Sequence, residues 1–212
     1  MTSVSDRSSR WAPLSGIAFV ILFVVGVLLT HTPAPNASDA KWVDYFGDGG
    51  HRAAMIVAAF LFVLAGLCLL SFLTTIWSRV AAAQHPDPLN PLPLVAAAVA
   101  CTSIAIGGVI NAAIAGAITF GDLPVPSADI LRVSDQLAFP VVAIAGMFAT
   151  SLAIACLSLQ ARRVGIFGRG LTTFSLIAAA ITLASFLFLP LLVMLLWFLV
   201  VAIALLRRGS PA

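Results

Sequence analysis

Long apolar runs, separated by short polar segments, dominate this chain. A bilayer core about 30 Å thick is crossed by a helix of ~20 apolar residues. Once the final apolar run is divided at Pro190, six segments are candidate spans: 13–31, 52–77, 93–120, 137–160, 171–188 and 191–206. The pattern therefore predicts an all-α fold, a polytopic membrane protein whose single integral domain (1–212) is a bundle of six transmembrane helices.

The final apolar run, 170–206, is too long for a single span. Pro190 lacks the backbone N–H that a helix interior needs, and its ring disturbs the preceding turn. We therefore predict a tight outer turn at residues 187–191 between two short spans.

Basic residues are distributed unevenly over the polar segments. If the N-terminus is cytoplasmic, eight Arg residues lie inside and only Lys41, Arg52 and Arg132 lie outside. Six of the eight Asp residues then lie outside. This bias follows the positive-inside rule and predicts an N-in, C-in protein of the bacterial cytoplasmic (inner) membrane. A five-helix alternative would place Arg207 and Arg208 outside.

Composition narrows the class further. The chain is 61% hydrophobic and 9% charged, whereas soluble domains are about 45–50% apolar and about 25% charged. The mean hydropathy of +1.12 agrees. Soluble, disordered and nucleic-acid-binding proteins are thereby excluded. The net charge of +3 is attributed to the arginines of the predicted cytoplasmic segments. The expected partners are the lipid bilayer and another membrane protein.

Two predicted outer loops contain signals for short helices. In the first, Ser38 or Asn36 is a candidate N-cap and Gly47 a stop. Trp42, Tyr45 and Phe46 share one face at helical spacing, which predicts an interfacial helix on the outer leaflet.

The second outer loop contains the same signals for a short helix. Ser127 is its candidate cap, and Ile130 and Val133 belong to a predicted amphipathic turn. The similarity of PAPNASD to PVPSAD fits either an old duplication or ordinary helix-start chemistry after proline.

Asn111 is the strongest polar residue inside a predicted span. It lies beside a small-residue stripe of Gly108, Ala112 and Gly116, which is typical of close helix packing. We expect Asn111 to bond across to a neighbouring helix, with these hydroxyl residues as candidates: Thr150, Ser151, Thr182 and Ser185. The alternative is a ligand-binding role for Asn111 in a central cleft.

A metal site is a further candidate on the outer side. His31 ends one predicted span, His51 begins the next, and Asp48 and other loop Asp residues lie nearby. Imidazole and carboxylate groups could bind a divalent ion, although the spacing matches no ligand motif. Asp48 and Arg52, four residues apart, are instead expected to form an ion pair.

No signature of a known enzyme occurs in the sequence, and no ionisable residue lies at mid-depth of a span. We expect no cofactor and a non-enzymatic accessory subunit, or a carrier or sensor for an apolar or lipid-like ligand. Two alternatives remain open: an outer-face metal-binding protein or enzyme, and a secondary transporter with a site near Asn111.

The order of motifs resembles a known group. It begins with WAPLSGIAFVILFVVGVLL, continues through VDYF and GHRAAMIVAAFLFVLAGLCLL, and ends with GRGLTTFSLIAAAI and LPLLVMLLWFLVVAIALLRR. Together these resemble an uncharacterised family of multi-pass membrane proteins common in actinobacteria, which carry a domain of unknown function. Many relatives have Trp-Leu where this chain has Gly170-Leu171. The resemblance implies topology and localisation but no activity.

Overall fold

The computed structural model describes residues 4–83, 91–184 and 189–208, and within these ranges the regular structure is helical. Its elements are α1 (Val4–Leu29), α2 (Asp39–Gly47), α3 (Gly49–Ala83), α4 (Leu92–Gly121), α5 (Ala128–Pro140), η1 (Val141–Gly146), α6 (Met147–Arg163), α7 (Arg169–Thr182) and α8 (Leu189–Arg208). The segments α5, η1 and α6 form one continuous helix, of which η1 is a π-helical part.

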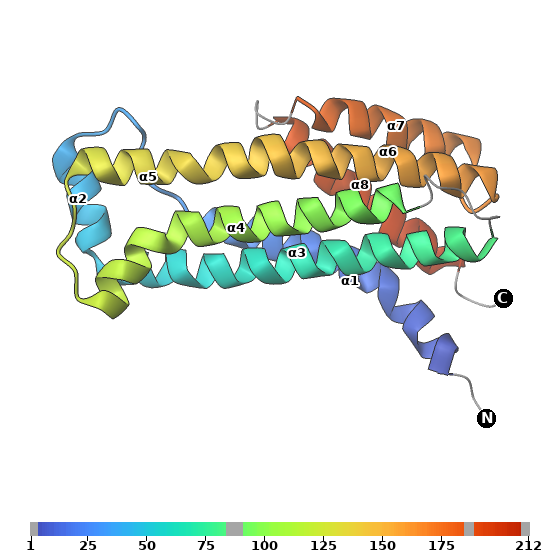
Figure 1. The fold of residues 1–212 in the computed structure, drawn as a ribbon, viewed down its shortest axis with the longest axis horizontal. Helices are drawn as coiled ribbons and strands as arrows, with labels where there is room; N and C mark the ends of the chain where they lie inside the picture. The colour runs from blue at the N-terminus through green and yellow to red at the C-terminus, as the bar shows by residue number, and fades with distance from the viewer. Residues whose placement is uncertain (1–3, 84–90, 185–188, 209–212) are drawn as a thin grey trace.

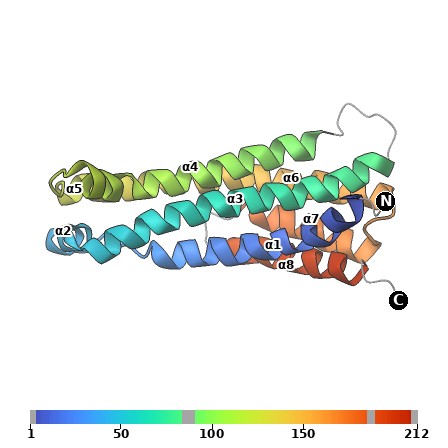
Figure 2. The same ribbon diagram turned by 90° about the horizontal axis from the view of Figure 1, so that it is seen from below.

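The long helices lie side by side along the longest axis of the molecule (Figures 1 and 2). The start of α1 and the end of α8 lie at one end of the bundle, and α2 lies at the opposite end. The shorter α7 and α8 flank only the half that contains the two termini. In that half α1 packs on α8, α8 on α7, and α7 on α6, so the helices close into a ring.

Buried aromatic and hydroxyl side chains hold this closed half together. The ring of Phe198 on α8 lies 4.6 Å from that of Phe19 and 5.6 Å from that of Phe72, measured between centroids. The indole N–H of Trp197 donates a hydrogen bond of 2.8 Å to Ser175 on α7. These contacts fix the α7–α8 pair against the longer helices.

Four helices of the described chain are long and apolar enough to cross a membrane: Gly49–Ala83, Leu92–Gly121, Ala128–Arg163 and Pro190–Arg207. The first and fifth predicted spans correspond to shorter apolar helices, Pro13–Leu29 and Arg169–Thr182. The structure therefore shows an all-helical protein with four candidate spans where six were predicted.

The predicted outer turn at residues 187–191 is wrong over its described part. Leu189, Pro190 and Leu191 already belong to α8, whereas residues 187 and 188 lie outside the described ranges. Proline is tolerated here because the first turn of a helix has no intrahelical partner for its N–H groups. Pro190 therefore begins a helix and does not form the predicted turn.

The fourth predicted span begins nine residues earlier than expected, at Ala128. Ser127 precedes it with φ −61° and ψ 152°, nearly the geometry of Ser38 before α2 (φ −61°, ψ 153°). Both predicted helix starts are therefore confirmed. The helix continues through Pro140, because η1 opens the backbone where proline cannot donate a hydrogen bond.

The predicted amphipathic turn of the second loop is thus the first part of a long helix. Leu131 is fully buried, while Ile130 and Val133 are more than half exposed.

The interfacial position predicted for α2 is not observed. Trp42 and Phe46 are buried in a second hydrophobic cluster with Met55 of α3 and Leu131 of α5. Their shared apolar face therefore lies against the bundle. The sequence could not decide this point, because a face that suits lipid also suits a protein groove.

Arginine side chains join the elements at the α2 end. Arg132 on α5 donates to the carbonyl of Ala37 (2.8 Å) and to the carboxylate of Asp39 (2.6 Å). Arg52 on α3 donates to the carbonyls of Phe46 (2.8 Å) and Gly47 (2.7 Å) at the end of α2. The expected Asp48–Arg52 ion pair is not a direct contact, since the unpaired carbonyls at the end of a helix attract the guanidinium. Besides the hydrogen bond from the backbone N–H of His51, the charge of Arg52 nevertheless helps to lower the pKa of Asp48.

Candidate functional site

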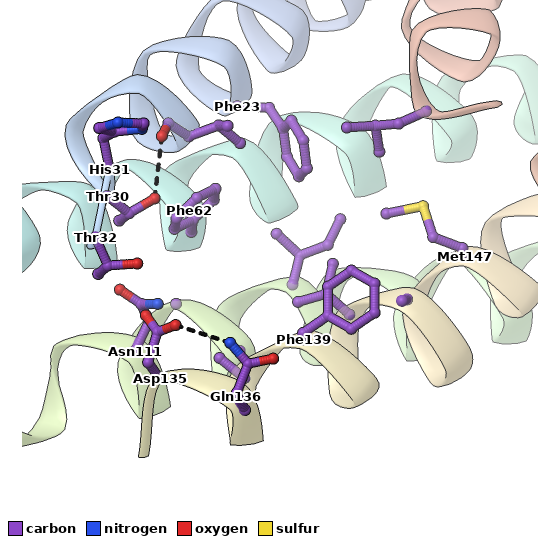
Figure 3. A pocket seen from close by; sticks show the side chains of 18 residues that line it. Phe23, Thr30, His31, Thr32, Phe62, Asn111, Asp135, Gln136, Phe139 and Met147 are labelled. Atoms are coloured by element: carbon purple, nitrogen blue, oxygen red, sulfur yellow. Dashed lines mark hydrogen bonds between the residues drawn. The ribbon is translucent and has the colours of Figure 1, made fainter. Parts of the chain in front are cut away.

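A cavity of about 370 Å³ lies in the half of the bundle that α7 and α8 do not flank (Figure 3). One wall is the end of α1 with residues 30–32, and the other is formed by α5, η1 and the first residue of α6. Residues of α3 and α4 form its floor. The volume lies within the range of small-molecule sites, about 300–1,000 Å³.

Helix packing explains why a cavity forms at this level. The helix α1 packs on α3 and α8, whereas α5 and η1 pack on α4, so the two walls are joined through the floor. Nearer the termini, α7 and α8 fill the equivalent space. Of the described residues in those two helices, only Leu191 lines the cavity, and it does so at the start of α8.

Polar side chains gather at one end of the cavity. His31 and Thr32 approach from the end of α1, and Asn111, Asp135 and Gln136 approach from α4 and α5 (Figure 3). The amide of Gln136 donates to the carboxylate of Asp135 at 3.1 Å. The hydroxyl of Thr32 also lines this end of the cavity. This end is therefore rich in hydrogen-bonding groups.

Asn111 contributes an unsatisfied acceptor to the polar end. Its Oδ1 atom is buried and accepts no hydrogen bond from the described residues. Nearby, the hydroxyl of Thr30 donates back to its own helix, to the carbonyl of Val27 at 3.1 Å. A buried acceptor without a partner is uncommon in proteins and costs free energy. A bound donor would remove that cost.

Apolar side chains line the other end of the cavity. They come from six helical elements: Phe23, Phe62, Ile104, Val142, Met147 and Leu191. In Figure 3, Phe139 and Met147 lie on the opposite side of the cavity from His31 and Asp135. The cavity is thus amphipathic along its length.

The π-helical segment shapes one wall. Val142 and Ala143 of η1 line the cavity, directly after Pro140. Gly107 of α4 faces this segment, and a Cβ atom there would collide with the side chain of Val142. The glycine therefore permits η1 to approach α4. π-Helical turns occur frequently at functional sites.

The expected bond between Asn111 and a neighbouring hydroxyl is not observed. Thr150, Ser151 and Thr182 instead donate to the carbonyls of Gly146 (2.8 Å), Ala179 (2.7 Å) and Ala178 (2.7 Å). Ser185 lies outside the described residues. Each hydroxyl is satisfied by a nearby carbonyl, which leaves Asn111 facing the cavity. Its ligand-binding role stays a prediction.

The small-residue stripe divides into two parts. Gly108 lies against Phe62 of α3, since a Cβ atom at this glycine would be 2.7 Å from the Cβ of Phe62. Ala112 is buried. Gly116 has open space, and Ala112 and Gly116 line a shallow apolar groove between α3 and α4. Close packing therefore occurs at Gly108 and not at Gly116.

The three predicted metal ligands are not brought together. His51 lies 3.5 Å from Asp48 and stacks on Tyr45 with centroids 4.3 Å apart, whereas His31 lines the cavity. No group of three His, Cys, Asp or Glu side chains in the described chain is arranged to hold a metal ion.

Asp48 has a structural position instead. Its carboxylate accepts a hydrogen bond from the backbone N–H of His51 at 2.9 Å, and this bond holds the pKa of Asp48 below its usual range.

A comparison with protein-family models, curated proteins and solved structures finds no match to this chain. The resemblance to actinobacterial multi-pass proteins therefore remains an expectation. Any functional conclusion depends on the cavity and on the distribution of charge.

The sequence alone did not predict that Asp135, Gln136 and the residues of the following π-helical segment line a cavity. One signal was present, because a polar pair stands directly before an apolar run that contains Pro140. Such a proline interrupts helical hydrogen bonds and opens a wall.

Proposed function

We propose that this protein binds a lipid-like molecule, with one polar headgroup and an apolar tail, in the cavity between α1 and α5–η1. The observation that supports the proposal is the polarity of the cavity, with hydrogen-bonding groups at one end and aromatic and aliphatic groups at the other. In this proposal the protein acts as a carrier, sensor or accessory subunit.

The spacing of charged residues along the helices supports a position for the cavity relative to the membrane surface. Arg52 and Arg79 of α3 enclose 26 residues without Asp, Glu, Lys or Arg, and Asp135 and Arg162 enclose the same number. As a helix, such a segment is about 39 Å long. This length exceeds the hydrocarbon core of about 30 Å and nearly equals the full bilayer thickness of about 40–45 Å with headgroups. The charged residues at its two ends are therefore expected at the two membrane surfaces. The polar end then lies at the headgroup level.

The apolar end extends from that level toward the bilayer centre. Asp135 and Met147 are twelve residues apart along one helix, which corresponds to about 18 Å. A bound molecule would thus have the orientation of a lipid in one leaflet. Large apolar side chains on the outside of the bundle, such as Phe60, Ile144 and Leu192, are more than half exposed and suit contact with lipid tails.

The proposal includes an orientation in the bacterial inner membrane. Both ends of the chain are placed in the cytoplasm, beside the described Arg residues of that end of the bundle, and the α2 end is placed outside. The cavity then opens toward the outer leaflet. In this arrangement α1 and α7 complete a six-span path, although the apolar part of α1 (Pro13–Leu29) and α7 are each short.

A photolabelling experiment tests the proposal. The protein is reconstituted in phosphatidylcholine nanodiscs with a single-chain probe that has a diazirine in its tail, and labelled peptides are mapped by mass spectrometry. We expect saturable labelling of residues in the segments 23–32 and 138–147. Excess unlabelled probe should abolish it.

Two variants on the same π-helical segment separate the cavity from the lipid-facing surface. Val142→Trp fills the cavity and should remove the saturable labelling. Ile144→Trp places the same ring on the outside, where Ile144 is 62% exposed, and should leave labelling unchanged. Equal labelling of both variants, with matching thermal unfolding, would contradict the proposal.

A further inference from the structure

We infer that the cavity selects a cationic headgroup, that of a protonated amine, and discriminates against a carboxylate. This inference rests on the proposed function, since it specifies the headgroup of the same lipid-like ligand. It comes from the inventory of donors, acceptors and charges at the polar end.

Acceptors are available at that end of the cavity. The Oδ1 atom of Asn111 is buried and has no partner among the described residues. Asp135 presents a carboxylate from the wall formed by α5, while Asn111 belongs to α4, which forms the floor at the same end of the cavity. A carboxylate has about four lone-pair positions, and the hydrogen bond from Gln136 occupies one of them. An ammonium group, with three donors and no acceptor, matches this arrangement.

No lysine or arginine occurs among the described residues that line the cavity. Arg132 lies one helical turn before Asp135, but its guanidinium is bound to Asp39, Asp129 and the carbonyl of Ala37. His31 lies at the exposed mouth. The carboxylate of Asp135 therefore has no arginine or lysine partner within the cavity.

Charge complementarity predicts an order of binding affinity among possible headgroups. An ammonium gains an ion pair with Asp135 and a hydrogen bond to Asn111, whereas a hydroxyl gains hydrogen bonds only. A carboxylate headgroup would place two like charges together at a site partly removed from water, which is unfavourable. The expected order of affinity is amine above alcohol above carboxylate.

Competition against the diazirine probe tests this order. Hexadecylamine, hexadecanol and palmitate share one tail length and differ in headgroup. Neutral phosphatidylcholine nanodiscs are used so that the membrane charge does not favour the amine. We expect hexadecylamine to displace the probe at the lowest concentration and palmitate at the highest.

Asp135→Asn keeps the shape of the side chain and removes its charge. It should reduce the preference for amine over alcohol by about tenfold, the effect typical of losing a hydrogen bond to a charged group. Asp44→Asn is the matched control, because it removes the same charge from the α2 end at a residue that does not line the cavity. That variant should retain the preference of the wild type.

The possible outcomes distinguish a failure of the headgroup inference from a failure of the lipid-binding proposal. If palmitate competes as well as hexadecylamine, or if Asp135→Asn leaves the preference unchanged, the headgroup inference is wrong and lipid binding stands. If no competitor displaces the probe, and Val142→Trp labels like Ile144→Trp, lipid binding fails and the headgroup inference fails with it.

Discussion

At the scale of single residues, similar side chains in α4 have different surroundings. Gly108 and Gly116 belong to one stripe, yet only Gly108 has a neighbouring side chain where its Cβ would be. A sequence motif of small residues is therefore not uniformly an interface. The two glycines form a natural pair for a stability test.

Gly108→Ala should destabilise the protein, because the added methyl group would lie 2.7 Å from the Cβ of Phe62. Overpacking of this kind costs about 1–3 kcal/mol. Gly116→Ala should be neutral or stabilising, since space is open and alanine favours a helix by about 0.5–1 kcal/mol. Thermal unfolding in detergent measures both. Equal unfolding midpoints would show that α3 and α4 do not meet at Gly108.

Asn111 provides a second prediction. Asn111→Leu should leave the unfolding midpoint unchanged or raise it, because the substitution removes a buried acceptor that has no described partner. Ser151→Ala should lower the midpoint, because it removes the 2.7 Å bond to Ala179 of α7. Hydrogen bonds between membrane helices contribute about 0.6 kcal/mol on average. A large loss of stability in Asn111→Leu would indicate that the side chain is structural.

At the scale of elements, ends of helices are joined by charged side chains. Arg132 binds the start of α2 from α5, and Arg52 binds the end of α2 from α3. The buried rings of Trp42 and Phe46 lie between these two attachments. The short helix is thus held by both packing and hydrogen bonds.

Arg132→Gln should loosen the start of α2, because the substitution removes the ion pair with Asp39 and the charge-assisted bond to Ala37. Hydrogen exchange is expected to increase over residues 38–47 and to remain unchanged in α6. Lys41→Gln, an exposed change on α2 itself, serves as the control. Faster exchange in the control than in Arg132→Gln would contradict this account of the attachment.

The N-terminus of α3 should respond to acid. Bonding to the backbone N–H of His51 lowers the pKa of Asp48, so the ionised carboxylate stabilises the folded form. This contribution is present above the pKa of the unfolded chain and is lost as the pH falls through the lower, folded-state pKa.

Exchange protection in the first turn of α3 is the measurement for this response. It should decrease on acidification in the wild type and show less pH dependence in Asp48→Asn, because asparagine is also a good cap. Identical pH profiles would show that the carboxylate does not stabilise this turn.

At the scale of the whole molecule, the two ends of the bundle differ in charge. The end with the termini contains Arg79, Arg162, Arg163, Arg169 and Arg207, whereas the α2 end contains most of the Asp residues. The orientation that we propose places the second end, and the mouth of the cavity, outside the cell. It leads to a direct topological test.

Reporter fusions test the orientation. Alkaline phosphatase should be active when fused after Asp39 or Asp129 and inactive after Arg79, Arg163 or Arg208, because basic residues are retained in the cytoplasm. A cytoplasmic reporter should give the complementary pattern. Alkaline phosphatase activity at the C-terminal fusion would contradict an even number of crossings and favour five spans.

The sequence by itself determined the all-helical class, the membrane environment, and the start of α2 and α5. These properties depend on local information: the length of apolar runs, and the cap residues Ser38 and Ser127 with the chemistry around them. Local information also led to the wrong prediction of a turn at Pro190, because a proline that interrupts one helix can equally begin another.

Only the tertiary structure decided where the polar residues act. Arg52 binds carbonyls of α2 and not Asp48, Trp42 faces the bundle and not lipid, and Asn111 borders a cavity instead of bonding to a hydroxyl. Each choice depends on which helices are neighbours, and α7 and α8 leave the cavity open because they flank only half of the bundle. Hydrophobic periodicity specifies that a face must be buried, but the partner that buries it comes from packing across the whole chain.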